Sequence, residues 1–132
     1  MTEEPQDIRC TQTHEWVRAE GKKLVMGITE YGQSLLSDVI RIELPEPDDH
    51  HYEANEDIAV IESLHAALDY HAPVAGTIIA VNHELLSKPE LINEDPYGDG
   101  WLVELKPDKM ADIDELMDID EYEAHLPDED EE

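Results

Sequence analysis

The stretch AVIESLHAALDYHAPVAGTIIAVN, residues 59–82, decides the fold of this chain. Branched and aromatic residues at 57–63 and 68–72 predict two strands, and the few residues between them predict a tight turn with His65 near its tip. A proline and a glycine then interrupt the pattern, and TIIAV at 77–81 predicts a buried strand. The centre of the chain is therefore expected to be a β-hairpin followed by a third strand.

Short strand-like segments continue on both sides of this hairpin. Alternating apolar residues and glycine-containing turns mark them at 14–19, 23–29, 39–44 and 101–105. Thr29 suits the N-cap of a short helix, and helical spacing of apolar residues from Asp108 onward predicts one or two amphipathic helices. Many short strands with a helical end predict an all-β sandwich or barrel with helical decorations.

Charge is the dominant compositional signal. The chain has 132 residues, with 35 acidic and 8 basic side chains, and a formal net charge of -27. Its length suits one hydrophobic core. Because phosphate backbones and anionic lipids would be repelled by such a surface, we expect neither nucleic acid nor a membrane as a partner.

Cysteine content and hydropathy bear on the compartment. Cys10 is the only cysteine, which excludes an intramolecular disulfide and a four-cysteine zinc site. The segment MTEEPQDIRC has neither a basic start nor an apolar stretch, and the apolar runs are too short to span a bilayer. We therefore expect a cytoplasmic protein.

Five separated blocks of this sequence resemble the H-protein family of the glycine cleavage system. They are THEWV (13–17), MGITEYGQSLLSDVIRIELPE (26–46), the opening stretch at 59–82, PELINEDPYGDGWLVELK (89–106) and LMDIDEYEAHL (116–126). The resemblance implies a lipoyl-domain-like sandwich of two antiparallel sheets, a barrel-sandwich hybrid with C-terminal helices. It also implies a single domain over 1–126, leaving PDEDEE at 127–132 as an acidic tail.

In the family that the chain resembles, a lysine at the hairpin tip is joined through an amide to lipoate. The arm collects an aminomethyl group from the decarboxylase, passes it to the aminomethyltransferase and is reoxidised by the dihydrolipoyl dehydrogenase. The family's Glu-Ser-Val-Lys-Ala is Glu-Ser-Leu-His-Ala here, at 62–66. An acylated imidazole is readily hydrolysed, so His65 cannot hold a stable lipoyl group. Because no other lysine has matching surroundings, the sequence predicts that the protein has no cofactor.

Two further groups of residues follow from the resemblance. Glu15 and Asp69 match carboxylates that line the cleft for the loaded arm in the family. Leu64 and Leu68 flank His65 and, together with Glu62, predict a protein contact at the hairpin tip.

The residues alone leave several roles open for His65. It is either a residue without a function, part of a protein contact, a metal ligand or a catalytic group. Metal binding would use His50, His51 or His71, but the spacing of these histidines is not typical of a zinc site. Catalysis as a phosphate carrier or an acid/base group lacks a phosphate loop and an activated nucleophile. The sequence therefore predicts no catalytic residue and no metal.

The prediction for function is a non-enzymatic H-protein-like domain without lipoate. It would dock to, regulate or scaffold the glycine cleavage enzymes or lipoate-handling enzymes. The alternative is a conventional H-protein that shuttles the aminomethyl group on a lipoyl arm. A second alternative is a histidine-based metal-binding or catalytic protein.

Overall fold

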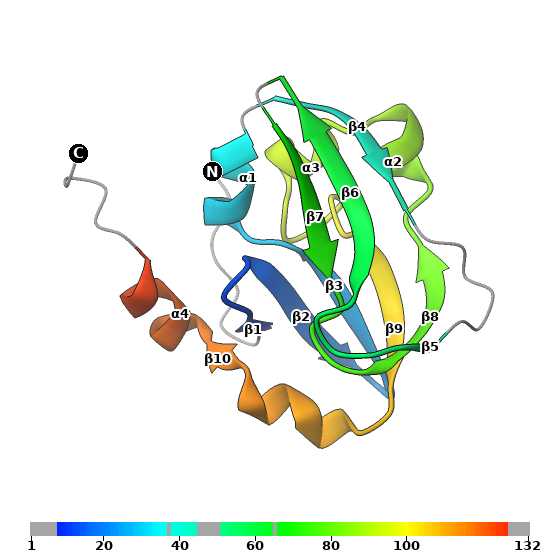
Figure 1. The fold of residues 1–132 in the computed structure, drawn as a ribbon, viewed down its shortest axis with the longest axis vertical. Helices are drawn as coiled ribbons and strands as arrows, with labels where there is room; N and C mark the ends of the chain where they lie inside the picture. The colour runs from blue at the N-terminus through cyan, green and yellow to red at the C-terminus, as the bar shows by residue number, and fades with distance from the viewer. Residues whose placement is uncertain (1–7, 37, 45–50, 65, 127–132) are drawn as a thin grey trace.

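The computed structural model describes residues 8–36, 38–44, 51–64 and 66–126, which form two antiparallel sheets with short helices around them (Figure 1). The strands are β1 (Ile8–Cys10), β2 (Glu15–Glu20), β3 (Lys23–Ile28), β4 (Val39–Glu43), β5 (His51–Tyr52), β6 (Asp57–Ser63), β7 (Ala67–His71), β8 (Gly76–Val81), β9 (Val103–Pro107) and β10 (Met117–Asp118). The helices are α1 (Glu30–Leu36), α2 (Glu84–Ser87), α3 (Leu91–Glu94), the 3-10 helix η1 (Met110–Glu115) and α4 (Ile119–His125).

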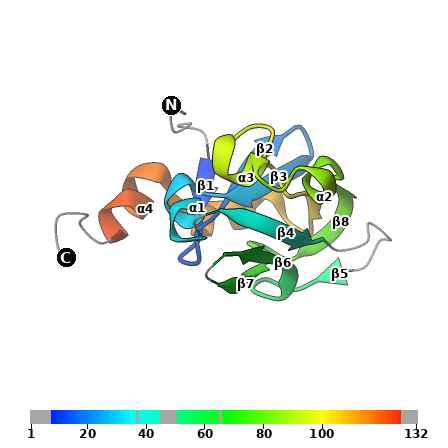
Figure 2. The same cartoon turned by 90° about the horizontal axis from the view of Figure 1, so that it is seen from above.

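One sheet has the strand order β10-β1-β2-β3-β9-β8-β5, and the other has the order β4-β6-β7. Figure 2 shows β6 and β7 as a separate layer from β2 and β3, with α4 standing to one side of the sheets. The predicted fold class, two antiparallel sheets with helical decorations, is confirmed. The single domain over 1–126 stays a prediction, and the acidic tail at 127–132 lies outside the described residues.

The main hydrophobic core lies between the two sheets. Alternation along β3 sends Leu24 and Met26 into it, where they join Ile61 from β6 and Ile78 from β8, all of them fully buried. Apolar burial of this kind supplies most of the stability of a small domain. The facing strands are thereby held in a fixed relation to each other.

A second core lies on the other face of the larger sheet. Trp16 is fully buried there, packs with Tyr97 and donates its indole N–H to the carbonyl of Pro96 at 3.0 Å. Ile119 and Tyr122 of α4 cover the same cluster. The C-terminal helix is therefore packed on the larger sheet through Ile119 and Tyr122.

The helices and their caps are partly as predicted. Thr29 caps α1, because its hydroxyl oxygen accepts the N–H of Gly32 at 3.0 Å. The segment predicted as one or two amphipathic helices contains η1, then the two-residue strand β10, then α4. A capping box between Asp118 and Glu121 begins α4. The prediction missed β10 because its two residues pair with β1, near the other end of the chain.

Candidate functional site

The tip of the β6–β7 hairpin is closed by local hydrogen bonds around Ser63. The backbone N–H of Ser63 donates to the carbonyl of Ala66 at 2.8 Å, and its side-chain oxygen accepts the N–H of Ala66 at 3.2 Å. Leu64 donates its N–H to the carbonyl of Asp38, just before β4, at 3.2 Å. The tip is thus anchored to a third strand of its sheet. His65 itself lies outside the described residues.

Apolar side chains flank this tip, as the sequence predicts. Leu64 is 62% exposed and Leu68 is 38% exposed. Glu62 forms an ion pair with Arg41 of the neighbouring strand β4, with 3.3 Å between Nη1 and Oε2. Exposed leucines beside a paired carboxylate suit a protein contact.

A buried carboxylate, Glu15, lies on β2 facing the smaller sheet. It is 1% exposed, and its oxygens accept four hydrogen bonds. The hydroxyls of Thr11 and Thr13 both donate to Oε1 at 2.5 Å. Oε2 accepts the backbone N–H of His71 at 2.9 Å and lies 3.3 Å from Nδ1 of the same residue. We call these four residues the Glu15 centre.

His71 connects this centre to the smaller sheet. Its Nε2 lies 3.2 Å from Oδ1 of Asp57, its partner in the register of β6 and β7. The imidazole therefore has a carboxylate at each nitrogen: one buried, on the larger sheet, and one exposed, on β6. Because 56 positions separate it from Glu15, no sequence pattern could have shown this contact.

Asp69, the second carboxylate expected to line the cleft, lies two residues before His71 on β7 and is exposed. Residues two apart share a face of a strand, so Asp69 lies on the same face as His71. Within the described part of the chain, no hydrogen bond or ion pair joins Asp69 to Glu15. The predicted pair of cleft carboxylates therefore stays a proposal.

A second polar network, not predicted from the sequence, adjoins the Glu15 centre. The hydroxyl of Tyr122 lies 2.7 Å from Nδ1 of His14 and 2.7 Å from the hydroxyl of Thr29. His14 has a left-handed backbone with φ of 75°, and its carbonyl accepts the N–H of Thr29 at 3.0 Å. The network joins α4 to the start of α1, and its members are too far apart in sequence to form a motif.

Burial controls the protonation of these groups. It lowers the pKa of His14, against the opposing charge of Glu15. Burial, with the Glu15 charge as a smaller cause, raises the pKa of Tyr70 to about 12. Burial also raises the pKa of Tyr122, although its hydrogen bond with Thr29 acts in the opposite direction. These groups are therefore neutral near neutral pH.

The histidines considered as metal ligands are engaged separately where the structure describes them. His51 lies 2.7 Å from Asp108, whereas His71 contacts Glu15 and Asp57. Among the described residues, no group of three or more His, Cys, Asp or Glu side chains is placed to hold a metal ion. His50 and His65 lie outside the described residues.

Comparison with known proteins gives a consistent result. The family model described as glycine cleavage H-protein matches residues 8–129. The glycine cleavage system H protein of Thermus thermophilus is 48% identical over 122 residues, which cover 92% of this chain and 94% of that protein. The H protein of Idiomarina loihiensis is 45% identical over 127 residues, covering 96% and 98%.

A solved structure supports the same relation. The crystal structure of a glycine cleavage system H protein from Mycobacterium marinum superimposes with a TM-score of 0.82 and 32% identity. The match covers 91% of this chain and 96% of that one. In the described part of the chain, no helix has the length and apolar character needed to cross a membrane.

The comparisons correct the prediction about the cofactor. The sequence predicted a protein without lipoate, but the relatives are glycine cleavage H-proteins, a family that carries lipoate. Absence of the cofactor is therefore not supported, and the prediction is wrong. The prediction rested on a single difference from the family sequence, which is His65 in place of the lysine.

The residues of the hairpin do not themselves fit an amide-linked lipoyl group. Residues 57–71 contain no lysine, and the imidazole of His65 forms only a labile acyl derivative. An amide in this chain requires one of its lysines elsewhere, which are Lys22, Lys23, Lys88, Lys106 and Lys109. Lys23 is paired with Glu104 at 3.0 Å, whereas the other four lysines are exposed.

H-proteins act with the glycine cleavage enzymes and are not enzymes themselves, which agrees with the prediction that this chain is not an enzyme. Its family is shown by a model that matches most of the chain, by close relatives and by the shared fold. The chain belongs to the glycine cleavage H-protein family.

Proposed function

We propose that this protein is the cytoplasmic shuttle of a glycine cleavage system, moving the aminomethyl group from the decarboxylase to the aminomethyltransferase. The observation that carries the proposal is the Glu15 centre. A carboxylate that is 1% exposed is costly to bury, and it is retained here between the two sheets with four hydrogen bonds. Such an anion suits the recognition of a protonated amine.

Glu15 has the geometry for exchange of one of its partners. An ionised carboxylate offers about four acceptor sites, and all four are used. The imidazole of His71 is the partner best able to leave, because its side chain is 26% exposed whereas its backbone N–H is fixed in β7. A protonated amine could then take its place on Oε2. Asp69, on the same face of β7, would add a second negative charge nearby.

The test of shuttling is co-expression with a lipoate ligase, followed by intact-mass and fragment-mass analysis. Shuttling requires a lipoyl mass on a lysine and exchange of bicarbonate with the carboxyl carbon of glycine when the decarboxylase is added. Lys22→Arg, Lys88→Arg, Lys106→Arg and Lys109→Arg variants would locate the attachment site. If the protein gains no lipoyl mass and supports no exchange, it is not the shuttle.

A second candidate function, docking to these enzymes or to a lipoate-handling enzyme, is favoured by the exposed leucines at the hairpin tip. Replacing Leu64 and Leu68 by serine should weaken binding to whichever enzyme docks there, measured by calorimetry. Leu86→Ser is the matched control, because Leu86 is 59% exposed but lies on α2. Equal loss of binding in the control would exclude the tip as the contact. The mass experiment separates this function from the shuttle, since docking at the tip needs no lipoyl group.

A further inference from the structure

The C-terminal helix α4 packs on the larger sheet through one face. Ile119 and Tyr122, one turn apart, are buried there in the same cluster as Cys10 of β1. The hydroxyl of Tyr122 lies 2.7 Å from the hydroxyl of Thr29 and 2.7 Å from Nδ1 of His14. We call Tyr122, Thr29 and His14 the α4 latch, because they join the helix to the segments before β2 and α1.

The hydrogen bonds of the α4 latch have a single direction. Thr29 is fully buried, and its side-chain oxygen accepts the N–H of Gly32 at 3.0 Å. Among the described residues, the only acceptor for its hydroxyl hydrogen is the oxygen of Tyr122. Tyr122 therefore donates its own hydrogen to Nδ1 of His14, and the neutral imidazole carries its proton on Nε2.

A proton added to Nδ1 of His14 has no place in this arrangement. It would face the hydroxyl hydrogen of Tyr122 across a distance of 2.7 Å. If Tyr122 turned to accept from both neighbours, its own hydrogen would lose its acceptor, and if it donated to Thr29, the hydrogen of Thr29 would lose its acceptor. Because Tyr122 and Thr29 are both buried, one unpaired hydroxyl would oppose the closed arrangement in either case.

The groups packed around the α4 latch favour the neutral imidazole. Burial lowers the pKa of His14, and the charge of Glu15, which acts in the opposite direction, is the smaller effect. The ring of Tyr31 on α1 lies 5.0 Å from the ring of His14, centroid to centroid. A cavity of about 230 Å³ beside His14 and Tyr122 is otherwise lined by uncharged residues, which are Gln12, Met117 and Leu126. The titratable groups around Tyr122 are Cys10, Tyr97 and Tyr31.

We propose that α4 is a pH-sensitive cover of the second core, closed while Nδ1 of His14 accepts from Tyr122 and released when a proton occupies that nitrogen. Release would uncover the cluster that contains Trp16 and Cys10. Since burial lowers the pKa of His14 from 6.5, closure is fully favoured above 6.5 and weakens as the pH falls to the lowered value. The cover is a property of the fold and does not rest on the proposed shuttle.

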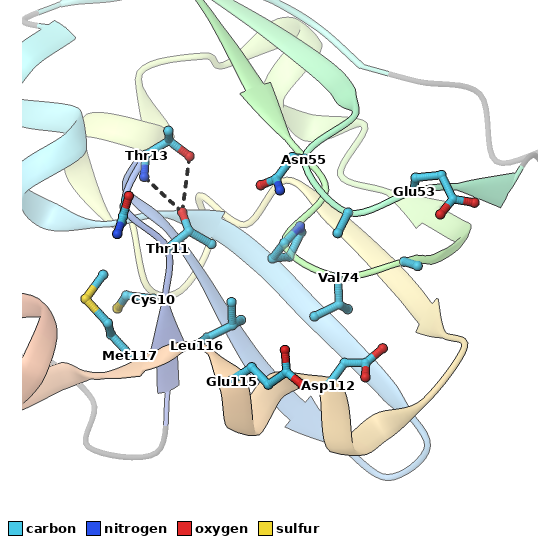
Figure 3. Close-up of a pocket in the computed structure, with 14 residues that line it drawn as sticks. Cys10, Thr11, Thr13, Glu53, Asn55, Val74, Asp112, Glu115, Leu116 and Met117 are labelled. Atoms are coloured by element: carbon cyan, nitrogen blue, oxygen red, sulfur yellow. Dashed lines mark hydrogen bonds between the residues drawn. The ribbon is translucent and has the colours of Figure 1, made fainter.

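Cys10 provides the assay, because it is the only cysteine of the chain and lies in the cluster that α4 covers. Figure 3 shows it beside Met117 at the edge of a cavity of about 570 Å³, but its side chain is 0% exposed. The measurement is the rate at which a pyridyl disulfide labels the folded full-length protein, divided by the rate for the urea-unfolded protein at the same pH. This ratio should rise up to about tenfold per pH unit below 6.5 and level off at the folded pKa of His14.

His14→Asn is the matched variant. Asparagine tolerates the left-handed backbone at this position, where φ is 75°, and its side-chain oxygen can accept from Tyr122 without titrating. Its labelling ratio should change less than about twofold over the same pH range. The control is His83→Asn, the same substitution at an exposed position before α2, which lies far from α4 in Figures 1 and 2. This control should keep the wild-type profile.

Three results would overturn the proposal. They are a wild-type ratio that does not change with pH, an equal rise in His14→Asn, and amide exchange in acid that rises as much in β3 as in α4, which would indicate global unfolding. If His14→Asn fails to fold, Tyr122→Phe decides, because it removes the hydroxyl that opposes the added proton. Its ratio should exceed that of the wild type above 6.5 and depend less on pH below it, and an equally steep profile would contradict the proposal.

Discussion

Replacing Glu15 by glutamine tests whether the buried carboxylate is held by its charge as well as by its shape. The substitution keeps the size of the side chain but turns one oxygen into an NH₂ group. Of its two orientations, the less costly places the NH₂ toward Thr11 and Thr13. The hydroxyl of Thr13 can rotate to accept, whereas that of Thr11 already accepts the backbone N–H groups of Thr13 and Glu15 at 3.2 Å. The remaining oxygen still faces His71.

The magnitude follows from the hydrogen bonds that lose their charge assistance. Four bonds to an ionised acceptor are replaced by about three neutral ones, and neutral bonds contribute about 1 kcal/mol each against about 1.5–3 kcal/mol for charged ones. Lower desolvation cost for the neutral amide offsets part of this loss. We expect Glu15→Gln to lower the free energy of unfolding by about 2 kcal/mol.

The general effect of charge has the opposite sign. Removing one negative charge from a chain at -27 relieves self-repulsion and should stabilise the fold slightly. Glu123→Gln, at an exposed position of α4, measures that effect alone. Urea unfolding near neutral pH and constant salt gives both values. If Glu15→Gln is as stable as Glu123→Gln, the charge of Glu15 does not hold the two sheets together.

Three further predictions concern other parts of the fold. Gly27→Ala should cost about 2 kcal/mol in urea unfolding, because its Cβ would lie 2.7 Å from the ring of the fully buried Trp16; unchanged stability would show that the ring can shift. In NMR titrations the pKa of His14 should lie below 6.5 and that of His51 above it, since burial lowers the pKa of His14 and the hydrogen bond with Asp108 raises that of His51. The reverse order would contradict these two environments. Stability that depends on neutral His14 is then present above 6.5 and lost as the pH falls through its folded pKa. The pKa of Tyr70 is raised from 10.0 to about 12, so this residue should contribute stability below pH 10 that is lost as the pH rises to 12. In urea unfolding, Tyr70→Phe should reduce this decline. An identical decline in the variant would refute the assignment.

The strands that the sequence predicted are those with strong local signals. Alternating residues at 39–44 and the branched run at 57–63 correspond to β4 and β6, and the small shifts at their ends are ordinary for strand boundaries. By contrast, β1 and β5 have three and two residues, too few for a period to appear. They exist because neighbouring strands offer free backbone groups.

The candidate site was predictable only where the resemblance named its residues. Glu15 was expected in a cleft, and the structure adds that it is buried and hydrogen-bonded by Thr11 and Thr13. His71 was considered only as a metal ligand, whereas its nitrogens lie beside Glu15 and Asp57. Such contacts depend on the packing of one sheet on another, which no local pattern encodes.

Thr11 and Thr13, in the connection between β1 and β2, both bind the buried carboxylate of Glu15. The hydroxyl hydrogens of Thr11 and Thr13 point to Glu15, and the same residues also line a cavity of about 570 Å³. Loss of Glu15's charge, as in Glu15→Gln, would free the hydroxyl hydrogen of Thr13 to turn away from Oε1. A fold that already holds many negative charges at its surface thus uses one buried charge to orient neutral groups.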